Sequence, residues 1–124
     1  MASVSRQAVI LFAHGARDAL WSLTLGDLAR RITARRSDAL VLQAFLEFQP
    51  PTLEESMAVA MNAGCRRIDI APVFWANGGH MVGDVPPLLA ELRARHPTLE
   101  LQLLPVLSEL PGLLDFIADA IAAR

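Results

Sequence analysis

Short apolar runs that alternate with helix-like segments constrain the fold of this chain more than any other feature of its sequence. Four runs are rich in branched apolar side chains and predict strands, at residues 8–13 (AVILFA), 39–48 (ALVLQAFLEF), 66–74 (RRIDIAPVF) and 99–106 (LELQLLPV). Helix-like segments follow them, at residues 18–36, within 50–65 (PPTLEESMAVAMNAGC), from about 84 or 85 to 95, and from about 111 to 123. Strands and helices that alternate in this way predict βαβ units, and therefore an α/β fold with a four-stranded parallel sheet covered by helices on both faces.

The first two helices carry clear signals of their own. Apolar side chains recur at helical spacing in the first helix, at Leu20, Leu23, Leu28 and Ile32. In the second, Thr52 and Glu55 match the capping-box pattern, and Gly64 supplies a stop at the other end. Both segments are therefore expected to be helical.

The chain is expected to form a single domain over residues 1–124. This length is ordinary for one domain, and 53% of the residues are hydrophobic, which is enough for a core. Nothing in the sequence states the strand order. If the order is 2-1-3-4, as in flavodoxin-like sheets, a ligand crevice is expected where the loops after the first and third strands diverge.

Charge and composition argue against several functional classes. The formal charge is −2, from 11 basic and 13 acidic residues that are interspersed along the chain, so nucleic acid is not an expected partner. No apolar stretch approaches the roughly 18 to 20 residues that a membrane span needs, and the N-terminal residues lead directly into a strand, so we expect a cytoplasmic protein without a membrane partner. The single cysteine, Cys65, excludes an internal disulfide and a Cys-rich zinc site and is expected to be structural.

Common nucleotide and hydrolase motifs are missing from the sequence. There is no G-x-G-x-x-G after the first strand, no G-x-x-x-x-G-K-[ST] and no G-x-S-x-G. The HG pair of AHGARD follows Ala13, where a histidine phosphatase would have an arginine. Dinucleotide binding, P-loop nucleotide binding and these hydrolase chemistries therefore have no support.

Two histidines occupy matching places in the predicted fold. His14 follows the first strand and precedes Gly15, and His80 follows two glycines in the loop after the third strand. If those strands are neighbours, both imidazoles reach one crevice, where they suit Co²⁺, Ni²⁺, Fe²⁺ or Zn²⁺ better than Mg²⁺ or Ca²⁺. The third histidine, His96, stands at a helix-to-strand turn and is expected to cap the helix C-terminus.

Each candidate also has a purely structural interpretation. A single histidine after a strand is more often an ordinary loop residue, and only the matching pair favours a metal site. Glu47 can be a solvated carboxylate at a strand end, or an oxygen ligand and proton acceptor. Arg17 and Asp18 can form a surface pair, and Asp84 is expected to be a plain N-cap.

The aromatic pair Phe74–Trp75 has two interpretations as well. Both rings can belong to the hydrophobic core. A tryptophan beside Asn77, Gly78 and Gly79 can also form a flat wall against a planar ligand.

Three segments carry a resemblance to a known family, namely LFAHGARD (11–18), AFLEFQPPTLEES (44–56) and IDIAPVFWANGGHMVGDVPPLLAELRARHP (68–97). Together they combine HG-x-R-D, FLE with a following P-[ST]-L, and P-x-F-x-x-x-GGH-x-x-x-D-[IV]-P. In this order the chain resembles the short-form CbiX-type sirohydrochlorin chelatases over nearly its whole length.

The resemblance implies a chelatase-like fold and an enzyme that inserts Co²⁺, or Ni²⁺ or Fe²⁺, into sirohydrochlorin on the way to cobalamin, coenzyme F430 or siroheme, without an organic cofactor. It assigns metal binding to His14 and His80, proton acceptance to His14, and a supporting catalytic role to Glu47. It assigns tetrapyrrole binding to Arg17 and to the loop Phe74, Trp75, Ala76, Asn77, Gly78 and Gly79. It also implies a homodimer with the macrocycle between subunits.

The chain departs from the family at its C-terminal turn and beside the metal loop. The family's G-x-H-P turn is replaced by LSELPGLL, with Ser108 and Leu110 in the glycine and histidine places, and Trp75 replaces a smaller aliphatic residue. The alternative function is therefore a non-catalytic carrier of metal or tetrapyrrole on the same fold.

Overall fold

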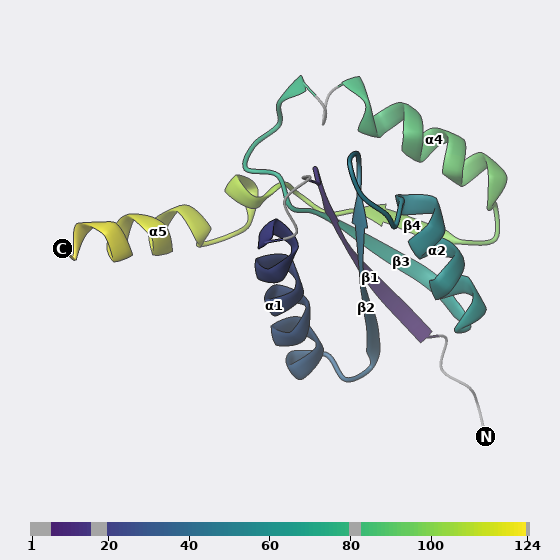
Figure 1. Ribbon diagram of the computed structural model, residues 1–124, viewed down its shortest axis with the longest axis horizontal. Coiled ribbons are helices and arrows are strands. Elements are labelled where there is room, and N and C mark those ends of the chain that lie inside the picture. Colours follow the sequence, from purple (N-terminus) through teal and green to yellow (C-terminus); the bar gives the residue numbers. More distant parts are fainter. Residues whose placement is uncertain (1–5, 16–19, 80–82, 124) are drawn as a thin grey trace.

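A four-stranded parallel sheet forms the centre of the molecule. The computed structural model describes residues 6–15, 20–79 and 83–123 (Figure 1). The strands are β1 (Arg6–Ala13), β2 (Ala39–Phe45), β3 (Cys65–Pro72) and β4 (Glu100–Leu103), in the order β2-β1-β3-β4 with every neighbouring pair parallel. The predicted α/β class is confirmed, and the observed strand order, 2-1-3-4, is the one for which a ligand crevice is expected where the loops after β1 and β3 diverge.

The helices are distributed unevenly over the sheet. They are α1 (Leu20–Arg35), α2 (Leu53–Asn62), α4 (Val85–Arg95), the 3-10 turn η1 (Leu107–Glu109) and α5 (Leu113–Ala122). Helix α1 lies on one face of the sheet and α2 and α4 on the other, while α5 projects away from the sheet (Figure 1). Cover on both faces is therefore confirmed, but the last predicted helix takes no part in it.

The core lies on the two faces of the central strand β1. Ile10 and Phe12 pack toward α2 and α4, whereas Val9 and Leu11 pack toward α1, because successive side chains of a strand point to opposite faces. A strand that is buried on both faces has to be apolar throughout, which explains the unbroken run AVILFA.

The buried side of α1 differs from its leucine pattern. Leu25, Leu28 and Ile32 pack against the sheet, but Leu20 and Leu23 are exposed. At 3.6 residues per turn, those two side chains project away from the side that carries Leu25. The periodic leucines thus predicted the helix correctly and only part of its buried side.

The second helix begins and ends as its sequence indicates. The Thr52 side chain accepts a hydrogen bond from the Glu55 N–H, and the Glu55 carboxylate accepts one from the Thr52 N–H at 2.8 Å, so the capping box is complete. Gly64 follows the helix with a positive φ of 88°, and the buried Cys65 then begins β3. The structural role expected for Cys65 is confirmed.

Several element ends fall inside the predicted ranges. β2 stops at Phe45, so Glu47 lies in the following loop, and β4 stops at Leu103. Asp84 occupies the N-cap position of α4, but its side chain makes no capping hydrogen bond, which corrects the expected cap. His96 occupies the C-cap position as predicted. Over the described part of the chain, no helix combines the length and apolar character that a membrane crossing requires.

Candidate functional site

His14 and Glu47 are brought together by backbone hydrogen bonds that continue beyond the ends of β1 and β2. The Leu46 N–H donates to the Ala13 carbonyl at 2.9 Å, and the Glu47 N–H donates to the His14 carbonyl at 3.0 Å. The His14 Nε2 atom lies 3.8 Å from Glu47 Oε2, and each side chain is 41% exposed. An imidazole and a carboxylate therefore stand side by side at the carboxyl edge of the sheet, within reach of solvent.

Gly15 allows this close approach of the two loops. Its φ is +95°, and a Cβ atom at this position would lie 2.1 Å from the Glu47 carbonyl oxygen. Any residue with a side chain would be strained by that φ and would collide with the backbone of the neighbouring loop. The glycine after His14 is therefore needed to bring the His14 and Glu47 side chains together.

Two aromatic rings lie edge-on to the His14 imidazole. The ring centroid of Phe48 lies 6.0 Å away and that of Phe74 lies 6.4 Å away. Phe74 also packs edge-on against the buried ring of Phe12, at 6.0 Å, so it connects the site to the core. Phe48 has a positive φ of 71°, a conformation that is uncommon for non-glycine residues and that recurs at ligand sites and active sites.

A groove of about 670 Å³ opens beside His14, between the flank of α1 and the exits of β1, β2 and β3. Its walls are mainly apolar and include Leu25, Leu28, Phe45, Val73 and Trp75. A concave apolar surface next to a few polar groups is the usual form of a small-molecule site. We refer to it below as the α1 groove.

Asp27 and Arg31 supply the charged part of the α1 groove. The Arg31 Nε donates to Asp27 Oδ2 at 3.0 Å, and this guanidinium holds the pKa of Asp27 below its usual value through the hydrogen bond and its positive charge. Analysis of the sequence did not select these residues, although an acidic and a basic residue four positions apart on a helix indicate an ion pair.

The loop after β3 only partly matches the predicted site. Trp75 lines the α1 groove and is 57% exposed, which fits a wall rather than a core residue. Asn77 instead donates to Glu109 Oε2 at 3.0 Å and so faces the η1 turn. Ala76, Gly78 and Gly79 are exposed, and a Cβ on either glycine would meet no atom within 4 Å.

Two predicted site residues, His80 and Arg17, lie outside the described residues. Within the described ranges, no group of three or more His, Cys, Asp or Glu side chains could hold a metal ion. The structure thus brings together His14 and Glu47 beside Phe74 and Trp75. An imidazole nitrogen and a carboxylate oxygen are donors that divalent transition metals accept, and two ligands leave further coordination positions for water or substrate.

Comparison with known proteins shows the family of this chain. Residues 8–124 match the model of the CbiX family. The sirohydrochlorin cobaltochelatase of Methanocaldococcus jannaschii is 32% identical over 90 residues, which cover 73% of this chain and 63% of the relative. That of Methanococcus maripaludis is 30% identical over 83 residues, which cover 67% of this chain and 58% of the relative. The match thus spans about three fifths of the length of these relatives.

Solved structures show the same fold. A CbiX protein ascribed to cobalamin biosynthesis in Marinobacter aquaeolei VT8 superposes with a TM-score of 0.79 and 29% identity, over 94% of this chain and 95% of that chain. The sirohydrochlorin chelatase SirB of Bacillus subtilis subspecies spizizenii, in complex with cobalt, superposes with a TM-score of 0.80 over 95% of this chain and 50% of that chain. At 19% identity, the second likeness shows the fold alone. On the family model and these relatives together, the chain belongs to the CbiX family.

Proposed function

We propose that this protein is a metal chelatase that inserts a divalent transition metal, foremost Co²⁺, into sirohydrochlorin. The observation that carries the proposal is the pair His14 and Glu47, with 3.8 Å between Nε2 and Oε2, next to the mainly apolar α1 groove. The names of the curated relatives, sirohydrochlorin cobaltochelatase, support this substrate and metal. The same donors accept Ni²⁺ and Fe²⁺, and the reaction needs no organic cofactor.

The proposed reaction exchanges two pyrrole protons for one metal dication. The ion loses water ligands, two N–H groups of the macrocycle are deprotonated, and four ring nitrogens replace the protein ligands. A neutral His14 imidazole can accept a pyrrole proton, and the adjacent Glu47 carboxylate can pass it to solvent. We assign a second metal ligand to His80. A site with few protein ligands favours transfer, because a closed cage of four ligands would retain the ion.

The macrocycle is proposed to bind in the α1 groove against the aromatic side chains after β3. Phe74 contacts His14, and Trp75 is exposed at the groove, so a flat tetrapyrrole can stack there with its centre toward the imidazole. We include Arg17 and the loop residues Ala76 to Gly79 in this surface as substrate contacts. We further propose that the chain works as a homodimer in the cytoplasm.

The test is the absorbance change of sirohydrochlorin on metal insertion, followed with Co²⁺, Ni²⁺ and Fe²⁺ in turn. His14→Ala is expected to lower the rate at least about 100-fold, because general acid–base groups contribute roughly 10²–10⁴ to a rate. His96→Ala is the matched control, since the His96 side chain lies beside Glu54 on α2, away from the site. A His14→Ala protein that retains the wild-type rate would contradict the assignment.

The same absorbance assay distinguishes a catalytic chelatase from a protein that only carries metal or tetrapyrrole. Stoichiometric binding of Co²⁺ or sirohydrochlorin without any acceleration over the uncatalysed reaction would favour the non-catalytic alternative. Glu47→Gln removes the carboxylate charge and preserves the shape of the side chain. We expect it to slow insertion less than His14→Ala does, because it acts on the proton relay alone.

A further inference from the structure

The wall that α1 contributes to the α1 groove combines a hydroxyl, an apolar side chain and an ion pair. Thr24, Asp27, Leu28 and Arg31 all line the groove. Residues three, four and seven positions after Thr24 share its side of the helix, so these side chains form one continuous flank. The pair of Asp27 and Arg31 is the charged part of this flank, beside walls that are mainly apolar.

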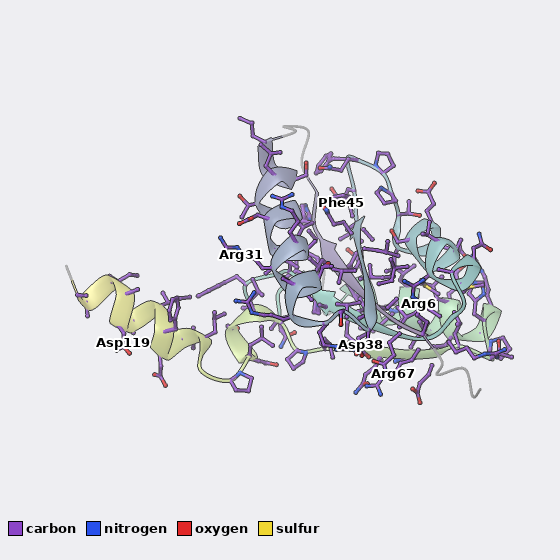
Figure 2. All side chains as sticks on the ribbon, turned by 90° about the horizontal axis from the view of Figure 1, so that it is seen from below. Arg6, Arg31, Asp38, Phe45, Arg67 and Asp119 are labelled. Carbon is purple, nitrogen blue, oxygen red and sulfur yellow. The ribbon has the colours of Figure 1, made fainter. Side chains whose placement is uncertain are left out.

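The Arg31 guanidinium is held at one edge and open at another. Its Nε atom donates to Asp27 Oδ2 at 3.0 Å, and the side chain is 67% exposed. Among the described residues, no protein acceptor takes a hydrogen bond from its terminal Nη1 and Nη2 groups, and Figure 2 shows Arg31 projecting from α1 at the surface of the molecule. A planar guanidinium binds a carboxylate through two parallel N–H···O bonds, and the two terminal nitrogens form an edge that can do so. Arg31 is therefore oriented by Asp27 and retains an edge that fits an external carboxylate.

The charge of this flank remains positive after the ion pair is counted. Helix α1 contains three arginines and a single aspartate. Asp27 accepts from Arg31 at 3.0 Å and from Arg30 at 3.5 Å, so two guanidinium groups share one carboxylate. Arg35 donates to the Arg31 carbonyl at 2.9 Å and adds a further positive charge nearby. An anionic group that approaches Arg31 is therefore attracted by the helix as a whole.

His14 and Arg31 line different ends of the same groove. His14 stands at the carboxyl edge of the sheet, and α1 runs back along the sheet from that edge (Figure 1). At a rise of 1.5 Å per residue, Arg31 lies about 10 Å further along α1 than Thr24. A tetrapyrrole carries its metal at the centre and its carboxylates on side chains around the rim. A contact to these carboxylates has to be remote from the metal ligands, and Arg31 is placed in this way.

We infer that the Arg31 guanidinium binds a carboxylate on the rim of the tetrapyrrole while His14 faces its centre. The inference rests on the proposed function and deepens it, because sirohydrochlorin carries carboxylate side chains around its macrocycle. The hydrogen bond from Nε to Asp27 restricts the orientation of the guanidinium before the ligand binds, which lowers the entropic cost of the contact. The apolar walls of the groove contact the rings, and Arg31 selects macrocycles whose rim is acidic.

Steady-state kinetics of Co²⁺ insertion into sirohydrochlorin test the role of Arg31. Arg31→Gln is expected to raise the KM for sirohydrochlorin about 10-fold, as the loss of a hydrogen bond between charged groups implies. It should change kcat less than about twofold, because a contact at the rim is equally strong in the ground state and in the transition state. Arg31→Lys, which keeps the charge but not the planar pair of donors, should give an intermediate KM.

Arg30→Gln is the matched control for these kinetics. Arg30 belongs to the same turn of α1 and also donates to Asp27, but it is not among the described residues that line the α1 groove. Its replacement removes the same charge from the helix and should leave the KM within about twofold of wild type. An unchanged KM in Arg31→Gln, or an equal rise in Arg30→Gln, would overturn the inference.

Equilibrium binding of metal-free porphyrins, followed by their absorbance, separates recognition of carboxylates from packing. Uroporphyrin has carboxylates around its rim, whereas tetrakis(N-methylpyridyl)porphyrin is a planar macrocycle with a positively charged rim and no carboxylate. Arg31→Gln is expected to weaken the binding of uroporphyrin about 10-fold and to leave that of the cationic porphyrin unchanged or tighter. An equal weakening of both would mean that Arg31 only shapes the groove, and would overturn the inference.

The two measurements also distinguish failure of this inference from failure of the proposed function. If the wild-type protein inserts Co²⁺ with a KM that does not depend on Arg31, the carboxylate contact is wrong and the chelatase is retained. If uroporphyrin binding depends on Arg31 but the wild-type protein does not accelerate insertion, the contact is supported and the chelatase is wrong.

Discussion

Replacing Gly15 by alanine is expected to destabilise the protein more than replacing any other described glycine. The new Cβ would lie 2.1 Å from the Glu47 carbonyl oxygen and 3.2 Å from its carbonyl carbon. Both are backbone atoms, so no side-chain rotation relieves the collision, and the loop after β2 has to move by about 1 Å. That movement breaks the hydrogen bond from the Glu47 N–H to the His14 carbonyl.

Three physical effects set the size of the loss at Gly15. An alanine held at a positive φ costs about 1–2 kcal/mol, a lost backbone hydrogen bond about 1 kcal/mol, and overpacking about 1–3 kcal/mol. We expect Gly15→Ala to lower the free energy of unfolding by about 3–6 kcal/mol, a large fraction of the 5–15 kcal/mol typical of a domain.

Urea unfolding followed by circular dichroism measures this loss, and two glycines serve as controls. Gly64→Ala shares the positive φ, at 88°, but its Cβ would meet no atom within 4 Å, so it should cost only about 1–2 kcal/mol. Gly78→Ala has open space and no positive φ, and should change stability by less than about 0.5 kcal/mol. The reasoning is refuted if Gly15→Ala and Gly64→Ala agree within about 0.5 kcal/mol.

Three further predictions concern other parts of the chain. Ser56→Ala should lower the free energy of unfolding in urea by about 1–3 kcal/mol. The buried Ser56 hydroxyl donates to the Gln43 carbonyl at 2.5 Å, and the substitution would leave this carbonyl without that donor. An unchanged free energy of unfolding would contradict the prediction. Burial raises the pKa of the Cys65 thiol, so a thiol reagent at pH 8 should react slowly with the native protein and rapidly in urea. NMR titration should show a higher pKa for Asp27 in Arg31→Ala than in wild type. Because the folded-state pKa of Asp27 is lowered, its ion pair favours folding above the unfolded-state pKa, and this contribution is lost as the pH falls through the folded-state pKa.

The α/β class and the position of His14 at the carboxyl edge of the sheet could be anticipated, because both follow from the alternation of buried strands and helices. Buried strands such as AVILFA are recognised by composition, and side chains that follow neighbouring strands must emerge at one edge. The capping box could be predicted as well, because Thr52 and Glu55 are only three residues apart. In each case the sequence pattern and the physical cause lie within a few residues of one another.

Other features depend on contacts between distant segments, and the sequence pattern did not reveal them. Asn77 turns toward Glu109 because the chain after β4 crosses the exit of β3, which no local motif records. The apolar spacing of α5 predicts a helix but does not say which surface will cover it. β2 ends at Phe45, before the segment LEF (46–48) that the sequence pattern assigned to this strand, and Phe48 in the following loop has a positive φ of 71°.

The backbone hydrogen bonds that join the loops after β1 and β2 bear on how strongly a ligand can be held at this edge. The backbone N–H groups of Leu46 and Glu47 donate to the carbonyls of Ala13 and His14 as in a continuing sheet, so the main chain that carries both candidate side chains is already ordered. A ligand that binds His14 and Glu47 has only to restrict their side-chain torsions. Ordering a backbone residue costs about 1–2 kcal/mol of conformational entropy. Because folding already orders the backbone at these positions, the binding of a ligand does not include this unfavourable contribution.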